Sequence, residues 1–186
     1  MRTKLFILFA AVAFTFGAAN VFAEGTPANE GKVNLSIEIH PIQTLIIKNS
    51  PKVALEYKTK EDYAQGVSKK IEDHIQIYST SGFEVKAKTN NANLVGTAGY
   101  TKTIATTDIS LTPENGSSSL QVGGLTTATL NGTSEVLVIT SETGGVDKNF
   151  HITYAAIGNN KYINHFVKGE NPTIYNTEVT YTIVAK

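Results

Sequence analysis

The apolar residues of this chain fall in short runs, and none of these runs has the spacing of a helix. After residue 23, no segment sustains apolar side chains at i, i+3, i+4 and i+7. Threonine, valine, isoleucine and tyrosine, which favour strands, are plentiful. The pattern predicts an all-β chain. After an opening strand in residues 33–39, the expected strands cover residues 42–48, 53–57, 71–78, 83–89, 103–111, 120–122, 135–140, 150–156 and 174–184.

Turn signals separate these runs about every 8 to 15 residues, which is typical of a β-sandwich, most often an immunoglobulin-like one. Gly123-Gly124 and Gly144-Gly145 are expected to form hairpin turns with positive φ. Residues 59–70 are predicted to be a loop or a single helical turn. The absence of a long linker or an internal repeat favours one sandwich domain over residues 42–186, preceded by an extension over residues 24–41.

The first 23 residues have the layout of a cleavable secretion signal. Arg2 and Lys4 precede an apolar stretch, and Val21-Phe-Ala23 provides the small residue that signal peptidases require. The apolar stretch is weakened from Gly17 onward, before it reaches the ~20 residues of a membrane span. We therefore expect an exported protein, with residues 1–23 excluded from the fold.

Composition excludes several classes of function. Without residues 1–23, 14 basic residues face 16 acidic ones, so the net charge is near −2 and gives no electrostatic basis for nucleic acid binding. The chain has no cysteine, which excludes disulfides and thiolate metal sites. The four histidines are scattered, and the motifs of phosphate-binding loops, serine hydrolases and zinc proteases are missing. We predict no enzyme activity, no cofactor and no metal.

The opening strand carries a regular alternation that ends at a proline. In Val33-Asn-Leu-Ser-Ile-Glu-Ile-His-Pro41, every second side chain is apolar, and after Pro41 the apolar residues continue in a different phase. Proline lacks an N–H for the ladder and restricts the residue before it to extended geometry. Pro41 is therefore predicted to mark a joint between two strands. The last run alternates through Val179, Tyr181 and Ile183, and we expect it to be a core strand.

This arrangement resembles the subunits of chaperone-usher pili, in particular major fimbrial subunits of the alpha-fimbrial, colonisation-factor branch. Those chains begin with an alternating apolar segment that ends in a polar or acidic residue and proline, continue into an apolar strand, and lack cysteine. Residues 33–41 are similar to the first part and residues 42–47 to the second, whereas His40 stands where an acidic residue is usual. The likeness covers residues 30–90 by pattern.

The resemblance implies that the sandwich lacks its last strand and that the opening strand of another copy completes it by donor-strand exchange. Its donor residues are then Val33, Leu35, Ile37 and Ile39. Copies of the chain, a periplasmic chaperone and an outer-membrane usher are the implied partners, and a surface fimbria that supports adhesion or biofilm formation is the implied location. The alternative is that residues 33–39 complete their own domain, which gives a self-complemented adhesin or envelope protein.

A second candidate site lies in the segment from residue 158 to 172. Tyr162, His165 and Phe166 interleave with amide side chains there, a composition that suits stacking on a sugar ring of a host or surface glycan. A long loop folded over one end of the sandwich explains the same residues.

Overall fold

A computed structural model of the protein describes residues 30–49, 52–96, 100–118 and 123–186. The predicted signal peptide and the run 120–122 lie outside these residues. The chain divides into two units, Met1–Glu38 and Ile39–Lys186. In the first unit, the described residues 30–38 form no helix or strand. No helix in the described part of the chain is long and apolar enough to cross a membrane.

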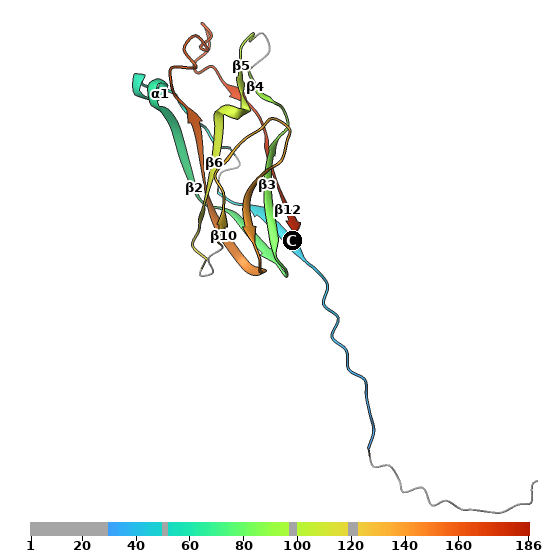
Figure 1. The fold of residues 1–186 in the computed structure, drawn as a ribbon. Coiled ribbons are helices and arrows are strands. Elements are labelled where there is room, and N and C mark those ends of the chain that lie inside the picture. The colour runs from blue at the N-terminus through green and yellow to red at the C-terminus, as the bar shows by residue number, and fades with distance from the viewer. Residues whose placement is uncertain (1–29, 50–51, 97–99, 119–122) are drawn as a thin grey trace, which may run out of the picture. The chain divides into compact units, whose positions relative to one another are not determined.

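The second unit is built from antiparallel sheets (Figure 1). The largest sheet contains, in spatial order, β1 (Gln43–Ile47), β2 (Gly66–Ser79), β10 (Gly145–Ile157), β6 (Ile109–Asn115) and β8 (Ala128–Thr129). The second sheet has the order β12 (Val179–Ala185), β3 (Phe83–Thr89), β9 (Val136–Ser141) and β7 (Gly124–Leu125). A small third sheet joins β11 (Tyr175–Asn176), β4 (Asn93–Gly96) and β5 (Thr103–Ala105).

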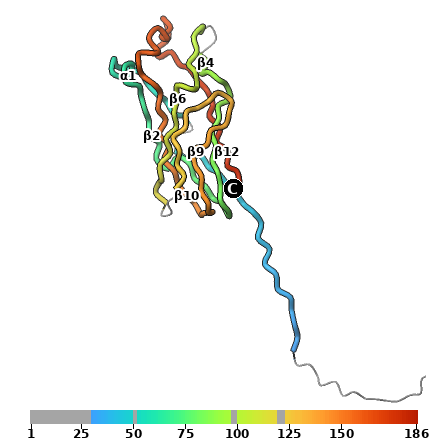
Figure 2. Tube along the Cα trace, viewed as in Figure 1, coloured from blue at the N-terminus to red at the C-terminus, as the bar shows by residue number. Residues whose placement is uncertain are grey.

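The two ends of the sandwich differ in the elements that close them (Figure 2). The end that we call the tip carries the helix α1 (Lys60–Gln65) and the loop 158–174, which are joined by the bond from Asn159 N to Ala64 O at 2.8 Å. At the opposite end, which we call the entry end, Ile42 O accepts a bond from Thr80 N at 3.0 Å. β12 also finishes there, since Lys186 N donates to Gly82 O at 3.0 Å.

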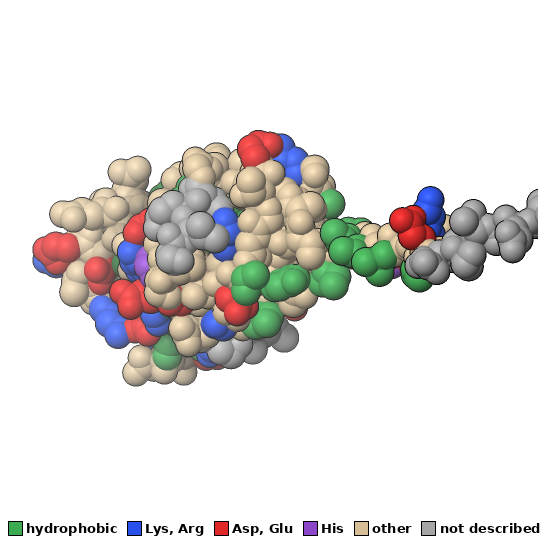
Figure 3. Space-filling view, turned by 90° about the horizontal axis from the view of Figure 1, so that it is seen from below, with side chains coloured by type: hydrophobic (Ala, Val, Ile, Leu, Met, Phe, Trp, Pro, Cys, Tyr) green, Lys and Arg blue, Asp and Glu red, His purple; other side chains and the backbone are tan. Residues whose placement is uncertain are grey.

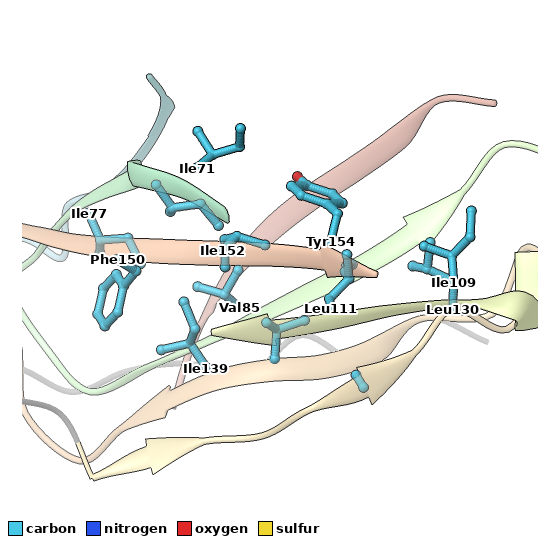
Figure 4. Close-up of a cluster of buried hydrophobic side chains, with 14 of the residues drawn as sticks. Ile71, Ile77, Val85, Ile109, Leu111, Leu130, Ile139, Phe150, Ile152 and Tyr154 are labelled. Carbon is cyan, nitrogen blue, oxygen red and sulfur yellow. The ribbon is translucent and has the colours of Figure 1, made fainter. Parts of the chain in front are cut away.

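The core lies between the two large sheets (Figure 4). Ile75, Ile77, Leu111 and Ile152 of the first sheet are fully buried, and the second sheet contributes buried side chains from β3 and β9. Apolar side chains alternate with polar ones along β3, as one buried face and one wet face require. The all-β prediction is confirmed, and the immunoglobulin-like strand order stays a prediction.

Several strand predictions need correction. Residues 53–57 form no strand, and the run 103–111 is divided by the 3-10 helix η1 (Thr106–Asp108). Residues 60–65 form α1, but residues 66–70 belong to β2. The ladder with β10 supplies the backbone bonds of residues 66–70, although their side chains are mostly polar.

Two features of the sheets were not expected from the sequence. The strand β4 contains too few apolar residues to be predicted. Pro113, expected in a turn, lies in β6 beyond the two residues that pair with β8, where one edge of the strand is unpaired.

The prediction that the two glycine pairs form hairpin turns is wrong. Gly124 begins β7, the strands on either side of Gly144 belong to different sheets, and none of the four glycines has a positive φ. Gly144 is required by close approach instead. A Cβ at this position would lie 2.3 Å from Ser79 O, which is closer than any side chain permits.

Candidate functional site

The four predicted donor residues carry aliphatic side chains that are largely exposed. Val33 and Leu35 are 90% exposed, Ile37 83% and Ile39 84%. Scattered exposed aliphatics are ordinary on a protein surface, but four on every second residue of one segment form a continuous apolar row. Such a row is the pattern of one face of a strand.

β12 is an edge strand of the second sheet. It pairs with β3 over its whole length and with no other strand of the described chain. Its residues Val179, Tyr181 and Ile183 pack against the core, yet they are only partly buried. Their pairing partners on β3 are fully or almost fully buried. β12 therefore has the composition of a core strand and the exposure of an edge.

Residues 52–58 have the burial pattern of a strand but no ladder. Burial alternates along them, with Val53, Leu55 and Tyr57 partly buried and the residues between them exposed. Val53 and Leu55 pack against the same core cluster as β12. No strand is assigned to the segment because no neighbouring strand of the described chain pairs with it.

We call the region bounded by β12, β1 and residues 52–58 the open edge. β1 pairs with β2 in the first sheet and also lies near β12 of the second. Ile42, Ile46 and Ile47 are between 43% and 52% exposed. Viewed from below, hydrophobic side chains of the molecule gather toward one side instead of being spread evenly (Figure 3). The open edge combines unpaired backbone with exposed apolar surface, a combination that natural edge strands usually avoid.

A buried polar network lies behind the open edge. His74 is 2% exposed, and its Nε2 lies 2.9 Å from the Tyr154 hydroxyl. The Tyr154 hydroxyl lies 2.8 Å from that of Tyr181 on β12. The imidazole Nδ1 faces Lys48 O at 2.8 Å and Asn49 O at 3.2 Å. Burial raises the pKa of the Tyr181 hydroxyl and that of Tyr154, so both remain hydrogen-bond donors.

The structure divides the three predicted glycan-binding residues between different environments. Tyr162 is 6% exposed, and its hydroxyl donates to Asp108 Oδ2 at 3.0 Å. Burial and the Asp108 carboxylate raise the pKa of Tyr162. Lys161 Nζ binds the other oxygen of Asp108 at 2.6 Å. Tyr162 is therefore part of the support of the loop.

His165 and Phe166, in contrast, lie at a pocket of about 230 Å³ near the tip. Tyr100 and Tyr175 also line it, with ring centroids 5.8 Å apart. Phe166 is 62% exposed, whereas Tyr175 is held by a bond from its hydroxyl to His165 O at 2.8 Å. The pocket is smaller than the ~300–1,000 Å³ typical of drug-sized ligands, so its capacity corresponds to a single ring.

Two pairs of adjacent carboxylates, Glu61-Asp62 and Glu72-Asp73, each contain an aspartate with structural partners. Asp62 accepts bonds from the backbone of Lys58 and Thr59, both at 2.7 Å, and these bonds lower its pKa. Asp73 accepts bonds from the hydroxyl and the backbone of Ser117, which lower its pKa. Within the described residues, no group of three histidine, aspartate or glutamate side chains is placed to hold a metal ion.

No family model matches the chain, and no curated protein matches it.

The polar network behind the open edge is the feature that sequence reasoning missed. Its one signal is a break in the alternation of β2. Asp73 stands in the same phase as Ile71, Ile75 and Ile77, and a polar residue in an apolar row is compatible with an irregularity in the strand. The sequence indicates neither the burial of His74 nor its partners.

Proposed function

We propose that the protein is the structural subunit of a surface fibre. In this fibre, residues 33–39 of one copy add a strand beside β12 of the next copy. The observation that supports this proposal is the pairing of two unsatisfied features, an exposed row of four aliphatic side chains and a sheet edge with partly exposed apolar residues. Strand addition satisfies both, because main-chain hydrogen bonds complete the sheet and the side chains fill the core.

The two strands match in length and phase. The alternating segment covers residues 33–39, and β12 covers the seven residues Val179–Ala185. Residues directly opposite each other in an antiparallel pair point to the same face. One antiparallel register therefore places three of the four donor side chains over core-facing residues of β12 and the fourth over the exposed Ala185. In it, Val33, Leu35, Ile37 and Ile39 lie opposite Ala185, Ile183, Tyr181 and Val179.

The short joint favours the antiparallel direction. Only His40, Pro41 and Ile42 separate Ile39 from the start of β1. The body of the donor copy must therefore lie close to the place where its strand ends. A parallel strand would bring this body to the entry end, where the chain of the acceptor copy itself enters. An antiparallel strand brings it to the tip and leaves the entry end free.

The free energy gained by burying the added strand is comparable to the whole stability of a domain. Burial of four aliphatic side chains contributes on the order of 6 to 12 kcal/mol as an upper bound, at ~1.5 to 3 kcal/mol each. A whole domain is stable by only ~5 to 15 kcal/mol. The proposal therefore includes a periplasmic chaperone that covers the open edge after export and an outer-membrane usher at which the strands are exchanged.

Cysteine pairs provide the test, since the natural chain has no cysteine. Glu38 and Thr180 are exposed and lie opposite each other in the antiparallel register. In the corresponding parallel arrangement, Thr180 lies opposite Asn34. Two matched variants of the chain without residues 1–23 are needed, Glu38→Cys with Thr180→Cys and Asn34→Cys with Thr180→Cys. Opposed residues in a sheet are ~4.5 to 5.5 Å apart, within the range of a disulfide.

The expected result is fibres in electron micrographs and a ladder of disulfide-linked copies for the Glu38 variant alone. A ladder for the Asn34 variant alone would show that the added strand is parallel to β12, and the proposal of strand addition would stand. A wild-type chain that stays monomeric at high concentration, with full stability, would overturn the fibre proposal and favour the self-complemented alternative.

A second candidate function, binding of a glycan at the tip, is favoured by the aromatic pocket. Among the residues that the structure describes, those that line the pocket include Lys102 and no carboxylate. Phe166→Ala removes the most exposed ring of the pocket and is expected to abolish binding on a glycan array. Tyr162→Ala is the wrong variant for this purpose, because it removes a buried support of the loop. Absence of binding by the natural chain would eliminate this candidate.

A further inference from the structure

A bulge in β2 turns His74 into the core. β10 pairs Phe150 with Ile75 and Ile152 with Ile71, so three residues of β2 face the single residue between them. Asp73 has a φ of 46°, in the left-handed region, and its N–H donates to His151 Nδ1 at 2.8 Å. As a result, two consecutive residues, His74 and Ile75, are both buried. Bulges commonly re-aim a side chain in this way.

The hydrogen bonds of His74 run in one direction. Its Nδ1 faces two carbonyl oxygens, which only accept, so this nitrogen carries the proton and donates. Nε2 then accepts from the Tyr154 hydroxyl, and the Tyr154 oxygen accepts from the Tyr181 hydroxyl. Each member of the chain is satisfied by the next. Networks of this kind hold a fixed geometry inside a core, whereas packed aliphatic side chains tolerate rearrangement.

The chain of bonds joins the two sides of the open edge. At one end, the carbonyls of Lys48 and Asn49 lie between β1 and residues 52–58. Lys48 N also donates to His74 O at 2.7 Å, and Asn49 Nδ2 donates to Glu72 O at 3.1 Å. At the other end, Tyr181 lies in the middle of β12. β12 has a ladder on one side only, so its other side is otherwise held by side-chain packing.

We propose that His74, Tyr154 and Tyr181 are positioning residues that fix β12 in the place where an incoming strand meets it. The inference rests on the fibre function proposed above. β12 already approaches β1, with Cα atoms of the two strands within 8 Å of each other, and in the described chain its only ladder is the one to β3. Without the polar tie, the apolar side chains of β12 gain burial by moving further toward β1, which leaves less room for the added strand.

Tyr181→Phe tests this role, because it removes one hydroxyl and keeps the shape of the ring. Tyr175→Phe is the matched control, since it also removes one bonded hydroxyl but lies at the tip. Tyr154→Phe interrupts the same network at its centre. The chain without residues 1–23 is added to preformed wild-type seeds, and the growth rate per seed is measured together with the urea midpoint of the monomer.

We expect growth to slow about fivefold for Tyr181→Phe and Tyr154→Phe, the factor that corresponds to the ~1 kcal/mol of one net hydrogen bond. Tyr175→Phe is expected to shift the urea midpoint by a similar amount and to grow at the wild-type rate. Equal growth rates for Tyr181→Phe and Tyr175→Phe would overturn the positioning role and leave the fibre proposal intact. A wild-type chain that forms no fibres would overturn both.

Discussion

The two long edges of the sandwich are closed to different degrees. At one edge, residues 124–130 cross from one large sheet to the other. Within them, β7 pairs with β9 of the second sheet, and β8 pairs with β6 of the first. Leu130 follows β8 and is fully buried, with its N–H bonded to Ile109 O at 2.9 Å. This crossing segment covers the core between the sheets, so we call it the closed edge.

At the open edge, the equivalent crossing is incomplete. β1 pairs in the first sheet, but residues 52–58 continue without a ladder to β12 of the second. The side chains that face the core from this edge, among them Leu45, Val53 and Ile183, are only partly buried. The comparison teaches that an apolar alternation is not sufficient to complete a sheet. A segment must also find backbone partners, and in the described chain neither residues 52–58 nor the outer side of β12 has one.

The largest effect is expected from a substitution in residues 33–39, the strand proposed to complete the open edge. Ile37→Asp places a carboxylate where the added strand would meet the core, and burial of an unpaired charge is far more costly than the loss of an aliphatic contact. We expect fibre growth to fall at least a hundredfold, while the urea midpoint of the monomer stays unchanged, because Ile37 is 83% exposed. Growth is measured by electron microscopy and light scattering.

Ser36→Asp is the matched control, because residue 36 lies on the opposite face of the same segment. It is expected to grow within a factor of two or three of the wild type. If Ser36→Asp and Ile37→Asp stop growth equally, the alternation has no role and the donor assignment is wrong.

The second prediction compares matched truncations at the two edges. Leu130→Ala at the closed edge is expected to lower the free energy of unfolding by ~2 to 5 kcal/mol, the usual cost of a cavity at a fully buried site. Ile183→Ala at the open edge is expected to cost ~1 kcal/mol in the monomer, because its side chain is only partly buried. Urea unfolding of the monomers measures both values.

In fibres, the stability costs of Leu130→Ala and Ile183→Ala should become similar, because the added strand buries Ile183. Dissociation of fibres in denaturant is the measurement, and Ile183→Ala is expected to lose several times more stability there than in the monomer. An Ile183→Ala cost that is the same in monomer and fibre would mean that this edge stays open after assembly.

The strands whose own residues alternate between apolar and polar could be predicted from the sequence. Elements whose structure depends on a distant pairing partner could not. β3 was predicted with its observed bounds, because it has one buried and one wet face. The last predicted strand, residues 174–184, is divided in the structure into β11 and β12, with Thr177 and Glu178 between them. The segment 53–57 has the same alternation but no partner, and β4 has partners but little alternation. The bulge at Asp73 could not be predicted, because its cause, the bond to His151, joins residues that are 78 positions apart.

The candidate site divides in the same way. The apolar alternation from Val33 to Ile39 and its end at Pro41 are local patterns that the sequence shows directly. The structure assigns no strand to these residues, and their role as a donor strand stays a prediction. The loop residues could be named but not sorted, since the burial of Tyr162 and the exposure of Phe166 depend on Asp108 and on the pocket. His74 could not be named as part of the site at all, because its partners come from three separate elements.

The smallest expected effect concerns the support of the bulge that places His74 behind the open edge. The hydroxyl of Ser117 donates to Asp73 Oδ2 at 2.5 Å, and its backbone N–H donates to Oδ1 at 2.9 Å. These bonds favour the carboxylate and hold the pKa of Asp73 below its ordinary value. Because the pKa is lowered in the folded state, the stabilisation is complete above the unfolded value of ~3.9 and is lost as the pH falls through the folded value.

Ser117→Ala is therefore expected to raise the pKa of Asp73 toward its ordinary value, measured from the carboxyl carbon resonance in an NMR titration. Ser118→Ala is the control, since the Ser118 hydroxyl accepts its bond from Asn149 N of β10, at 3.1 Å. The acid unfolding midpoint should move to slightly higher pH for Ser117→Ala alone. Fibre growth should slow by less than twofold, because the bond from Asp73 N to His151 still holds the bulge and the tie from His74 to Tyr181 stays in place. A slowing as large as that of Tyr181→Phe would instead place the control of the open edge in the bulge itself.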